Sequence, residues 1–237
     1  MAADGKVIAI TGGSTGIGAE TARRAVADGD RVVLAARSED KLEALAAELG
    51  GAETAVAVRC DVSEWSDNER LVSEALEAFG RIDAVFANAG FGAKRGFLEE
   101  TPEHWRSMVL TNVLGVAYTI RATLPHLLDR GTGHYLITSS VAGRRALPGS
   151  IYSATKWAVT ATGEALRQEL RQIHDNRRIR VTLIEPGVVD TPFFDQRPGP
   201  DNALHDDDIA RAVLFALDQP ERVDVNEILI RPTQQPT

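Results

Sequence analysis

The sequence predicts an α/β fold, in which a doubly wound parallel sheet of about seven strands forms the middle of three layers. Short apolar segments alternate with longer amphipathic segments along the whole chain. The apolar segments are rich in Val, Ile, Ala and Leu, which is typical of strands buried on both faces. Such alternation implies parallel strands joined by helical crossovers. Because no linker or repeat interrupts residues 1–237, we expect a single domain.

Each expected strand is a short apolar run, and a longer helical pattern follows all but the last. The strands are VIAIT (7–11), RVVLAA (31–36), TAVAVRC (54–60), RIDAVFA (81–87), HYLITS (134–139), RIRVTLIEP (178–186) and VNEILIRP (225–232). The helices are residues 17–28, 38–49, 64–79, 102–129 (with breaks), 150–174 and 206–218. Residues 191–205, which contain Pro, Asp and Asn, follow the sixth strand and are expected to form a loop at the carboxyl edge, where ligands bind in such folds.

The composition excludes several classes of protein. With 26 basic and 34 acidic residues, the formal net charge is −8. This charge argues against binding to nucleic acid or to anionic membranes. The single cysteine, Cys60, excludes an intramolecular disulfide and a cysteine-rich zinc site. Without a visible signal peptide or an apolar run of about 18 residues, we expect a cytoplasmic protein.

Metal binding is not expected. The five histidines show no metal-ligand spacing and are expected at the surface or in capping positions. Three consecutive acids, Asp206 to Asp208, are better explained by the start of a helix, where negative charge complements the helix dipole.

A glycine-rich segment, TGGSTGIG, follows the first strand and opens directly into a helix. Glycines let backbone amides approach a pyrophosphate, and a helix N-terminus favours negative charge. The spacing differs from G-x-G-x-x-G, and a tight turn without a ligand is the alternative. Its position after the first strand favours a dinucleotide site. This phosphate cradle is expected to comprise Gly12, Ser14, Thr15, Gly16, Ile17 and Gly18.

The end of the second strand indicates which dinucleotide binds. NAD-binding folds usually carry an acid here that bonds the ribose 2′-hydroxyl, whereas this chain has Ala36 followed by Arg37. A guanidinium matches a 2′-phosphate in shape and charge, which favours NADP(H) over NAD(H). The alternative is a solvated Arg37, with Glu39 and Asp40 near enough to pair with it. Asp61 is expected either to accept a bond from adenine or to cap the next helix.

Tyr152 and Lys156 lie four residues apart in YSATK, which places both on one helix face. A neighbouring cation favours the phenolate and lowers the pKa of the tyrosine. Tyr152 could then donate and accept a proton in a carbonyl–alcohol couple. An ordinary surface pair is the alternative.

Six motifs occur in a recognisable order. They are TGGSTGIG, Asn88-Ala89-Gly90, TNVLG around Asn112, SSVAG (139–143), YSATK (152–156) and Glu185-Pro186-Gly187. Over essentially the whole chain this series resembles the short-chain dehydrogenase/reductase family. The resemblance implies a Rossmann-type fold and an NAD(P)-dependent oxidoreductase acting on CH–OH groups (EC 1.1.1). The C-terminal VNEILIRPTQQ resembles NADP-dependent members that act on 3-hydroxy acids, serine and small aldehydes.

The resemblance implies a role for each matching residue. Tyr152 matches the catalytic acid/base, and Lys156 matches the lysine that binds the nicotinamide ribose and lowers the tyrosine pKa. Asn112 matches the asparagine that holds a water for proton relay. Ser140 matches the serine that polarises the substrate oxygen, because SVAG follows the family pattern. Ser139 is the alternative, because it lies 13 residues before Tyr152, the usual spacing, whereas Ser140 lies 12 before it.

The family pattern also implies further cofactor contacts. Beyond the phosphate cradle and Arg37, the expected cofactor-binding residues are Asp61, Val62, Asn88, Ala89, Gly90, Tyr152, Lys156, Pro186, Gly187, Val189 and Thr191. Phe193 and Phe194 follow in the loop and either cap the substrate pocket or anchor the loop.

Together these features predict hydride transfer between NADP(H) and a carbonyl or a primary or secondary alcohol. Ser140 and Tyr152 would bond the carbonyl oxygen, and Tyr152 would deliver the proton. Family members commonly pair through helices near 102–129 and 150–174, so a homodimer or homotetramer is expected. The alternatives are a catalytically silent cofactor sensor or scaffold and an adenosylmethionine-dependent methyltransferase.

Overall fold

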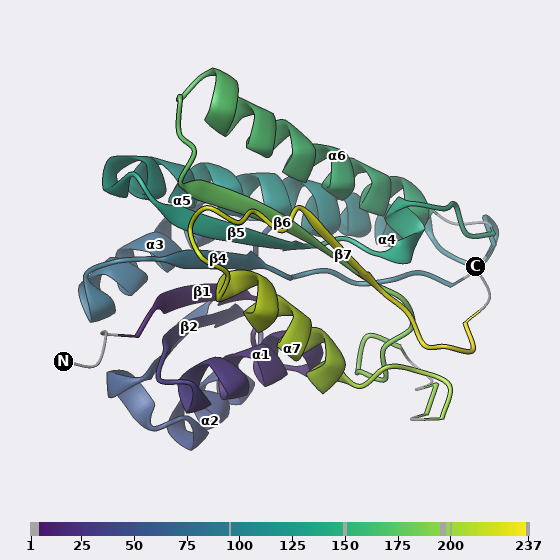
Figure 1. The fold of residues 1–237 in the computed structure, drawn as a ribbon. Helices are drawn as coiled ribbons and strands as arrows, with labels where there is room; N and C mark the ends of the chain where they lie inside the picture. Colours follow the sequence, from purple (N-terminus) through teal and green to yellow (C-terminus); the bar gives the residue numbers. More distant parts are fainter. Residues whose placement is uncertain (1–4, 95, 149–150, 195–197, 200, 236–237) are drawn as a thin grey trace.

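The strands form one parallel sheet in a computed structural model that describes residues 5–94, 96–148, 151–194, 198–199 and 201–235. Their order is β3-β2-β1-β4-β5-β6-β7 (Figure 1). The strands are Val7–Thr11 (β1), Arg31–Ala36 (β2), Ala55–Arg59 (β3), Ala84–Ala87 (β4), Gly133–Thr138 (β5), Ile179–Pro186 (β6) and Glu227–Ile230 (β7). Each lies within or next to its sequence-predicted range, and the predicted α/β fold is confirmed.

Helices cover both faces of the sheet. They are Gly16–Ala27 (α1), Glu39–Glu48 (α2), Trp65–Phe79 (α3), Pro102–Val109 (α4), Gly115–Arg130 (α5), Ile151–Gln172 (α6) and Asp206–Leu217 (α7). Helices α1, α2 and α7 lie on one face, and α3, α5 and α6 lie on the other (Figure 1). The predicted start of α6 at Ser150 falls outside the described residues.

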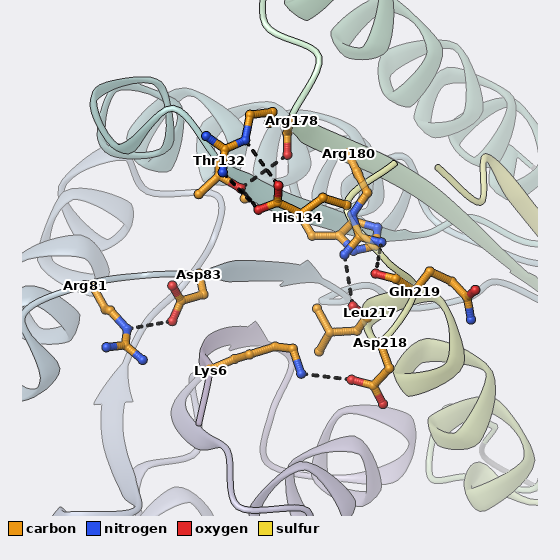
Figure 2. Close-up of a pocket in the computed structure, with 12 residues that line it drawn as sticks. Lys6, Arg81, Asp83, Thr132, His134, Arg178, Arg180, Leu217, Asp218 and Gln219 are labelled. Carbon is orange, nitrogen blue, oxygen red and sulfur yellow. Dashed lines mark hydrogen bonds and ion pairs between the residues drawn. The ribbon is translucent and has the colours of Figure 1, made fainter. Parts of the chain in front are cut away.

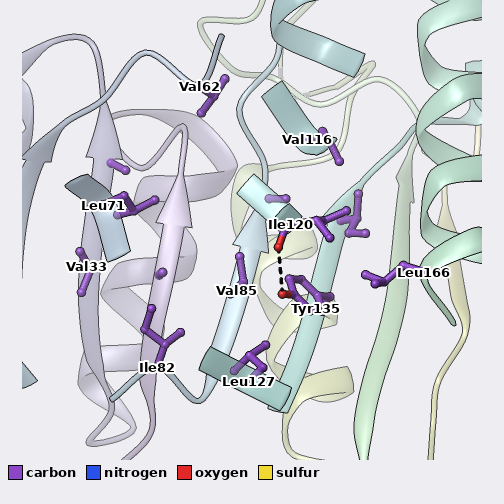
Figure 3. Packing of buried hydrophobic residues seen from close by; sticks show 14 of the residues in the cluster. Val33, Val62, Leu71, Ile82, Val85, Val116, Ile120, Leu127, Tyr135 and Leu166 are labelled. Carbon is purple, nitrogen blue, oxygen red and sulfur yellow. Dashed lines mark hydrogen bonds between the residues drawn. The ribbon is translucent and has the colours of Figure 1, made fainter. Parts of the chain in front are cut away.

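Two apolar layers hold the helices to the sheet. In one layer Val85 and Tyr135 pack with Leu71 of α3, Ile120 of α5 and Leu166 of α6 (Figure 3). The second layer joins the opposite side chains of the same strands to α1, α2 and α7. Because the central strands are covered on both sides, their sequences are continuously apolar rather than alternating.

The helical region after β4 differs from the expectation. We predicted breaks within residues 102–129, but α4 and α5 are joined without interruption by a wide π turn, Leu110–Leu114 (η2). Asn112 lies in this turn and is fully buried. Single π turns inside helices recur at functional sites.

A cavity of about 340 Å³ at the amino edge of the sheet carries matched charges (Figure 2). The Nζ of Lys6 lies 2.9 Å from Asp218, and Arg178 lies 3.1 Å from Glu221. The Arg180 guanidinium donates to carbonyls near the C-terminal end of α7, including Leu217 at 2.9 Å. These donors are therefore used to secure the edge of the sheet.

One histidine departs from its predicted position. His134 is 1% exposed, because β5 is covered on both faces, and its Nε2 lies 2.8 Å from the hydroxyl of Thr182. Desolvation lowers the pKa of His134 to about 3. In the described part of the chain, no three His, Cys, Asp or Glu residues are grouped as metal ligands. Nor does any described helix have the length and apolar character needed to cross a bilayer.

Candidate active site

The main cavity, of about 900 Å³, lies at the carboxyl edge of the sheet. It opens where the chain reverses its direction across the sheet, between β1 and β4, with β2 and β3 on one side and β5 and β6 on the other. Ligands of doubly wound sheets bind at such a switch point. The segments after β1 to β6 all contribute to its lining.

Most of the sequence-predicted site residues line this cavity. They are Gly12, Ser14, Thr15, Gly16, Ile17, Arg37, Asp61, Val62, Asn88, Ala89, Gly90, Ser140, Tyr152, Lys156, Pro186, Gly187, Val189 and Thr191. The two others, Gly18 and Asn112, are buried behind the wall. The fold thus brings together motifs that lie far apart in the sequence.

The glycines of the phosphate cradle have no room for side chains. Gly12 and Gly16 adopt φ of 66° and 53°, a region that favours glycine. A Cβ on Gly18 would lie 2.3 Å from the Gly12 carbonyl oxygen and 2.9 Å from Nδ2 of Asn88. At these glycines the wall is therefore bare backbone beside the N-terminus of α1, an arrangement that fits a pyrophosphate.

The wall beyond β2 is basic. Arg37 lines the cavity, and no ion pair between Arg37 and Glu39 or Asp40 is found among the described residues. Lys41 of α2 lines the same region and was missed by the sequence analysis. Its spacing from Arg37, four residues, was the available signal. The two cations fit a phosphate in this part of the cavity.

Asp61 does not cap helix α3. Its carboxylate accepts from the amide and hydroxyl of Ser63, at 3.0 and 2.7 Å, and α3 begins later, at Trp65. Asp61 instead forms the turn that leads from β3 into the cavity wall. Asn88 also has a structural role, because it donates to the carbonyl of Thr11 at 3.3 Å and accepts from Thr138 at 3.0 Å.

The two adjacent serines at the end of β5 point in different directions. The Ser140 hydroxyl hydrogen-bonds with the phenol of Tyr152, lies within donating distance of the Pro186 carbonyl at 3.4 Å and accepts from the amide of Ala142 at 3.1 Å. The Ser139 hydroxyl instead donates to the carbonyl of Lys156 at 3.1 Å and lies 2.7 Å from the Thr160 hydroxyl. Only Ser140 is thus paired with the tyrosine.

The pKa of Tyr152 differs from the sequence-based expectation. Desolvation raises the pKa of Tyr152 to about 12, and the bond with Ser140 only partly offsets this shift. Lys156 donates from Nζ to the Thr138 carbonyl at 2.9 Å, and its Nζ lies 5.8 Å from the centre of the Tyr152 ring. Burial lowers the pKa of Lys156 to about 8. The predicted lowering of the tyrosine pKa is therefore not seen here, because desolvation exceeds the opposing effect of the bond from Ser140.

Asn112 holds the segment after β4. Its Oδ1 accepts from the amide of Phe91 at 3.0 Å, and its Nδ2 donates to the Phe91 carbonyl at 2.9 Å. Nδ2 also lies 3.2 Å from the hydroxyl of Thr155, one residue before Lys156. The side-chain amide therefore joins the π turn, the segment after β4 and α6.

Aromatic residues form the outer wall. Phe193 lines the cavity and packs edge to face on Tyr152, with ring centroids 5.9 Å apart. A Cβ on Gly92 would lie 2.7 Å from its ring. Phe193 therefore contacts both walls of the cavity, as the pocket-capping alternative requires. Phe194 also lines the cavity, whereas residues 195–197 and 200 of the predicted loop lie outside the described part.

Gln235, near the C-terminus, also lines the cavity and was missed. Its Oε1 accepts from the amide of Val188 at 2.9 Å. A Cβ on Gly187 would lie 2.2 Å from the same oxygen. Nothing in the local sequence indicates this contact, because it depends on how β6 and the chain after β7 come together.

Comparison with known proteins decides the family. The model of the family described as short chain dehydrogenase matches residues 6–200. The chain belongs to this family. Membership excludes the methyltransferase alternative. A relative in Listeria monocytogenes, described as an uncharacterized oxidoreductase, is 37% identical over 249 aligned positions that cover 100% of both chains.

Solved structures of the family agree closely with the fold. An alcohol dehydrogenase from the archaeon Thermococcus sibiricus, complexed with 5-hydroxy-NADP, is 38% identical with a TM-score of 0.88, and 98% of each chain is covered. A 3-ketoacyl-(acyl-carrier-protein) reductase from Brucella melitensis, complexed with NADH, is 30% identical with a TM-score of 0.86, covering 96% of this chain and 97% of that one. The chain is thus an oxidoreductase of this family.

Proposed function

We propose that the protein is an NADP-dependent oxidoreductase that acts on the CH–OH group of an alcohol or on the corresponding carbonyl. The observation that carries the proposal is the hydrogen-bonded pair of Ser140 and Tyr152 in the same cavity as the phosphate cradle. Both family members described above act, by their names, on an alcohol or a keto group. A silent cofactor sensor or scaffold, the alternative, would need the phosphate cradle but no such pair.

The phosphate cradle would hold the pyrophosphate, and the segment Pro186 to Val189 would lie beside the nicotinamide. Arg37 and Lys41 would bind the 2′-phosphate, and Asp61 would face the adenine. Thr191 touches the phosphate cradle, because a Cβ on Gly16 would lie 3.1 Å from it. When bound, NADPH supplies the hydride.

Residues of the chain itself would hold and donate the proton. Tyr152, with a pKa of about 12, is neutral at physiological pH and so holds the proton that a developing alkoxide needs. Ser140 would donate a second hydrogen bond to the same oxygen, which stabilises its growing charge. Lys156, whose pKa is about 8, changes its charge near neutral pH and would bond the cofactor ribose.

The relay to solvent would run through Lys156 and a water held by Asn112. Because the Asn112 amide bonds Phe91 and Thr155, its main-chain carbonyl in the π turn is the group that would hold the water. The side chain then keeps the turn in place.

For the substrate we propose a small carbonyl or alcohol of the 3-hydroxy acid, serine or small-aldehyde type, on the likeness of VNEILIRPTQQ. Phe193, which spans the cavity, supports a small site. We further propose a cytoplasmic homodimer or homotetramer. Trp157 on α6 is 49% exposed and Val109 on α4 is 38% exposed, as expected for helices that face a second subunit.

A substrate panel tests the proposed function. Aldehydes, ketones, 3-hydroxy acids and serine are offered with NADPH or NADH, NADP⁺ or NAD⁺, and absorbance of the reduced cofactor is followed. We expect turnover of a small substrate with a higher kcat/KM for NADPH than for NADH. Tight NADPH binding without turnover of any substrate would favour the sensor.

A further inference from the structure

A polar cluster built around one buried carboxylate lies behind the Ser140–Tyr152 pair. It consists of Ser139, Arg144, Thr160 and Glu185, and is called the rear cluster below. Glu185 is its centre: its side chain is 1% exposed, on β6, one residue before Pro186. Glu185, Arg144 and Thr160 do not line the cavity, so the proposed mechanism leaves this buried carboxylate without a role.

Each member of the rear cluster comes from a different segment. The Nε of Arg144, just after the 3-10 turn Val141–Gly143 (η3), lies 2.7 Å from the Glu185 carboxylate. Thr160 of α6 hydrogen-bonds with the same carboxylate and lies 2.7 Å from the Ser139 hydroxyl. Arg144 also pairs with Glu227 at the start of β7. The cluster therefore joins β5, η3, α6, β6 and β7.

The η3 turn packs against the rear cluster without space between them. A Cβ on Gly143 would lie 2.6 Å from the Ser139 hydroxyl oxygen, 2.7 Å from that of Thr160 and 2.7 Å from the carbonyl oxygen of Lys156. Any movement of η3 therefore disturbs the backbone of α6 at Lys156. Ser140, the first residue before η3, is only four positions from Arg144.

The charge of Glu185 makes Arg144 essential to this arrangement. A buried carboxylate is tolerated when it is paired and hydrogen-bonded, and it is strongly unfavourable when its partner is removed. Burial raises the pKa of the Glu185 carboxyl, and the bond from Arg144 counteracts that rise. With Arg144 in place, the carboxylate keeps η3 and β6 together at the point where both enter the cavity.

We propose that the Arg144–Glu185 pair is a positioning device that holds Ser140 on η3, Tyr152 and Lys156 on α6, and the Pro186 segment in their reactive arrangement. This inference rests on the proposed function. The pair acts through these neighbours and touches no substrate itself. Displacing such groups by about 1 Å can cost on the order of 100-fold in rate, even when the substitution lies away from the chemistry.

Four variants test the proposal: Arg144→Ala, Glu185→Gln, the double variant Arg144→Ala/Glu185→Gln, and Arg145→Ala as matched control. Arg145 is the next residue, is exposed, and takes no part in the rear cluster. Turnover with NADPH is measured per folded molecule, below the unfolding temperature of each variant. The dissociation constant and the emission spectrum of bound NADPH are measured as well.

We expect Arg144→Ala to lower kcat by about 10- to 100-fold, with little change in the KM for NADPH, because the phosphate cradle lies at the other side of the cavity. The double variant should stay about as impaired as Arg144→Ala, because without Arg144 nothing links η3 to β6, whether or not residue 185 is charged. Arg145→Ala should match wild type. A merely structural role predicts lower thermal stability with unchanged kcat per folded molecule, and that result would overturn the proposal. A double variant with near-wild-type kcat would overturn it too, because it would show that Arg144 serves only to neutralise the buried charge of Glu185.

The emission of bound NADPH keeps the test independent of turnover. If wild type binds NADPH but turns over no substrate, the proposed function fails. The positioning role then predicts an altered emission for Arg144→Ala and also for the double variant. Identical spectra for wild type and Arg144→Ala would refute the positioning role even in that case.

Discussion

The adjacent residues Ser139 and Ser140 allow two substitutions of the same chemistry to be compared at one strand end. Ser140→Ala removes a hydroxyl that bonds the phenol of Tyr152 and accepts from the amide of Ala142 at 3.1 Å. Ser139→Ala removes a hydroxyl that donates to the carbonyl of Lys156 at 3.1 Å and lies 2.7 Å from the Thr160 hydroxyl. We therefore expect the first change to affect catalysis and the second to affect mainly stability.

The magnitudes follow from what each hydroxyl does. Removing a hydrogen-bond donor from a developing oxyanion costs about 2.7–4 kcal/mol, so Ser140→Ala should lower kcat by roughly 100- to 1,000-fold. Each buried bond lost from Ser139 costs about 1–3 kcal/mol of folding free energy, because a partner is left unsatisfied. Its effect on kcat should stay within about threefold, which corresponds to less than 1 kcal/mol.

Steady-state kinetics with NADPH and the best substrate of the panel provide the assay, and urea unfolding gives the stability of each variant. Both variants should lose stability, because each hydroxyl makes buried hydrogen bonds, so kcat is the quantity that separates them: low kcat for Ser140→Ala and near-native kcat for Ser139→Ala. A larger loss of kcat in Ser139→Ala would show that the 13-residue spacing, and not the orientation seen here, identifies the catalytic serine.

Three further outcomes follow from the site. Tyr152→Phe keeps the ring that contacts Phe193 and should lower kcat by about 100- to 10,000-fold while NADPH affinity, measured by fluorescence, stays nearly unchanged; activity within threefold of wild type would contradict the assignment. Arg37→Ala should raise the KM for NADPH, because about 1.5–3 kcal/mol of binding free energy is lost with the charge-assisted bond. The double variant Ala36→Asp/Arg37→Ala should shift the preference in kcat/KM from NADPH toward NADH. An unchanged ratio of kcat/KM for the two cofactors would make Arg37 a solvated surface charge. Because the folded-state pKa of Lys156, about 8, lies below the ordinary lysine value of 10.5, the unfolded chain binds more protons between these pH values, and the contribution of Lys156 to the free energy of unfolding rises with pH there. Urea unfolding of wild type and Lys156→Met at pH 7 and pH 10 should show a relative gain for wild type of about 2 kcal/mol at the higher pH, and parallel curves would contradict the shift.

The strands and their order along the chain could be predicted from local sequence. Residues 7–11 and 31–36 were predicted to the residue, because strands buried on both faces need uninterrupted apolar side chains. The phosphate cradle was visible for a similar reason, since backbone that must approach a ligand closely requires glycine. Tyr152 and Lys156 were recognisable because both lie on one helix, where spacing alone places them on a common face.

Other features were decided only by the tertiary structure. The orientations of Ser139 and Ser140 depend on α6 and β6, which pack against the end of β5 from distant parts of the chain. Lys41 and Gln235 reach the cavity because the sheet brings the ends of β2 and β6 to one edge. The pKa of Tyr152 rises, contrary to the prediction, because desolvation depends on every group packed around the phenol. Sequence spacing determines which residues share a face of one element, whereas burial and contacts between elements arise only when the whole chain has folded.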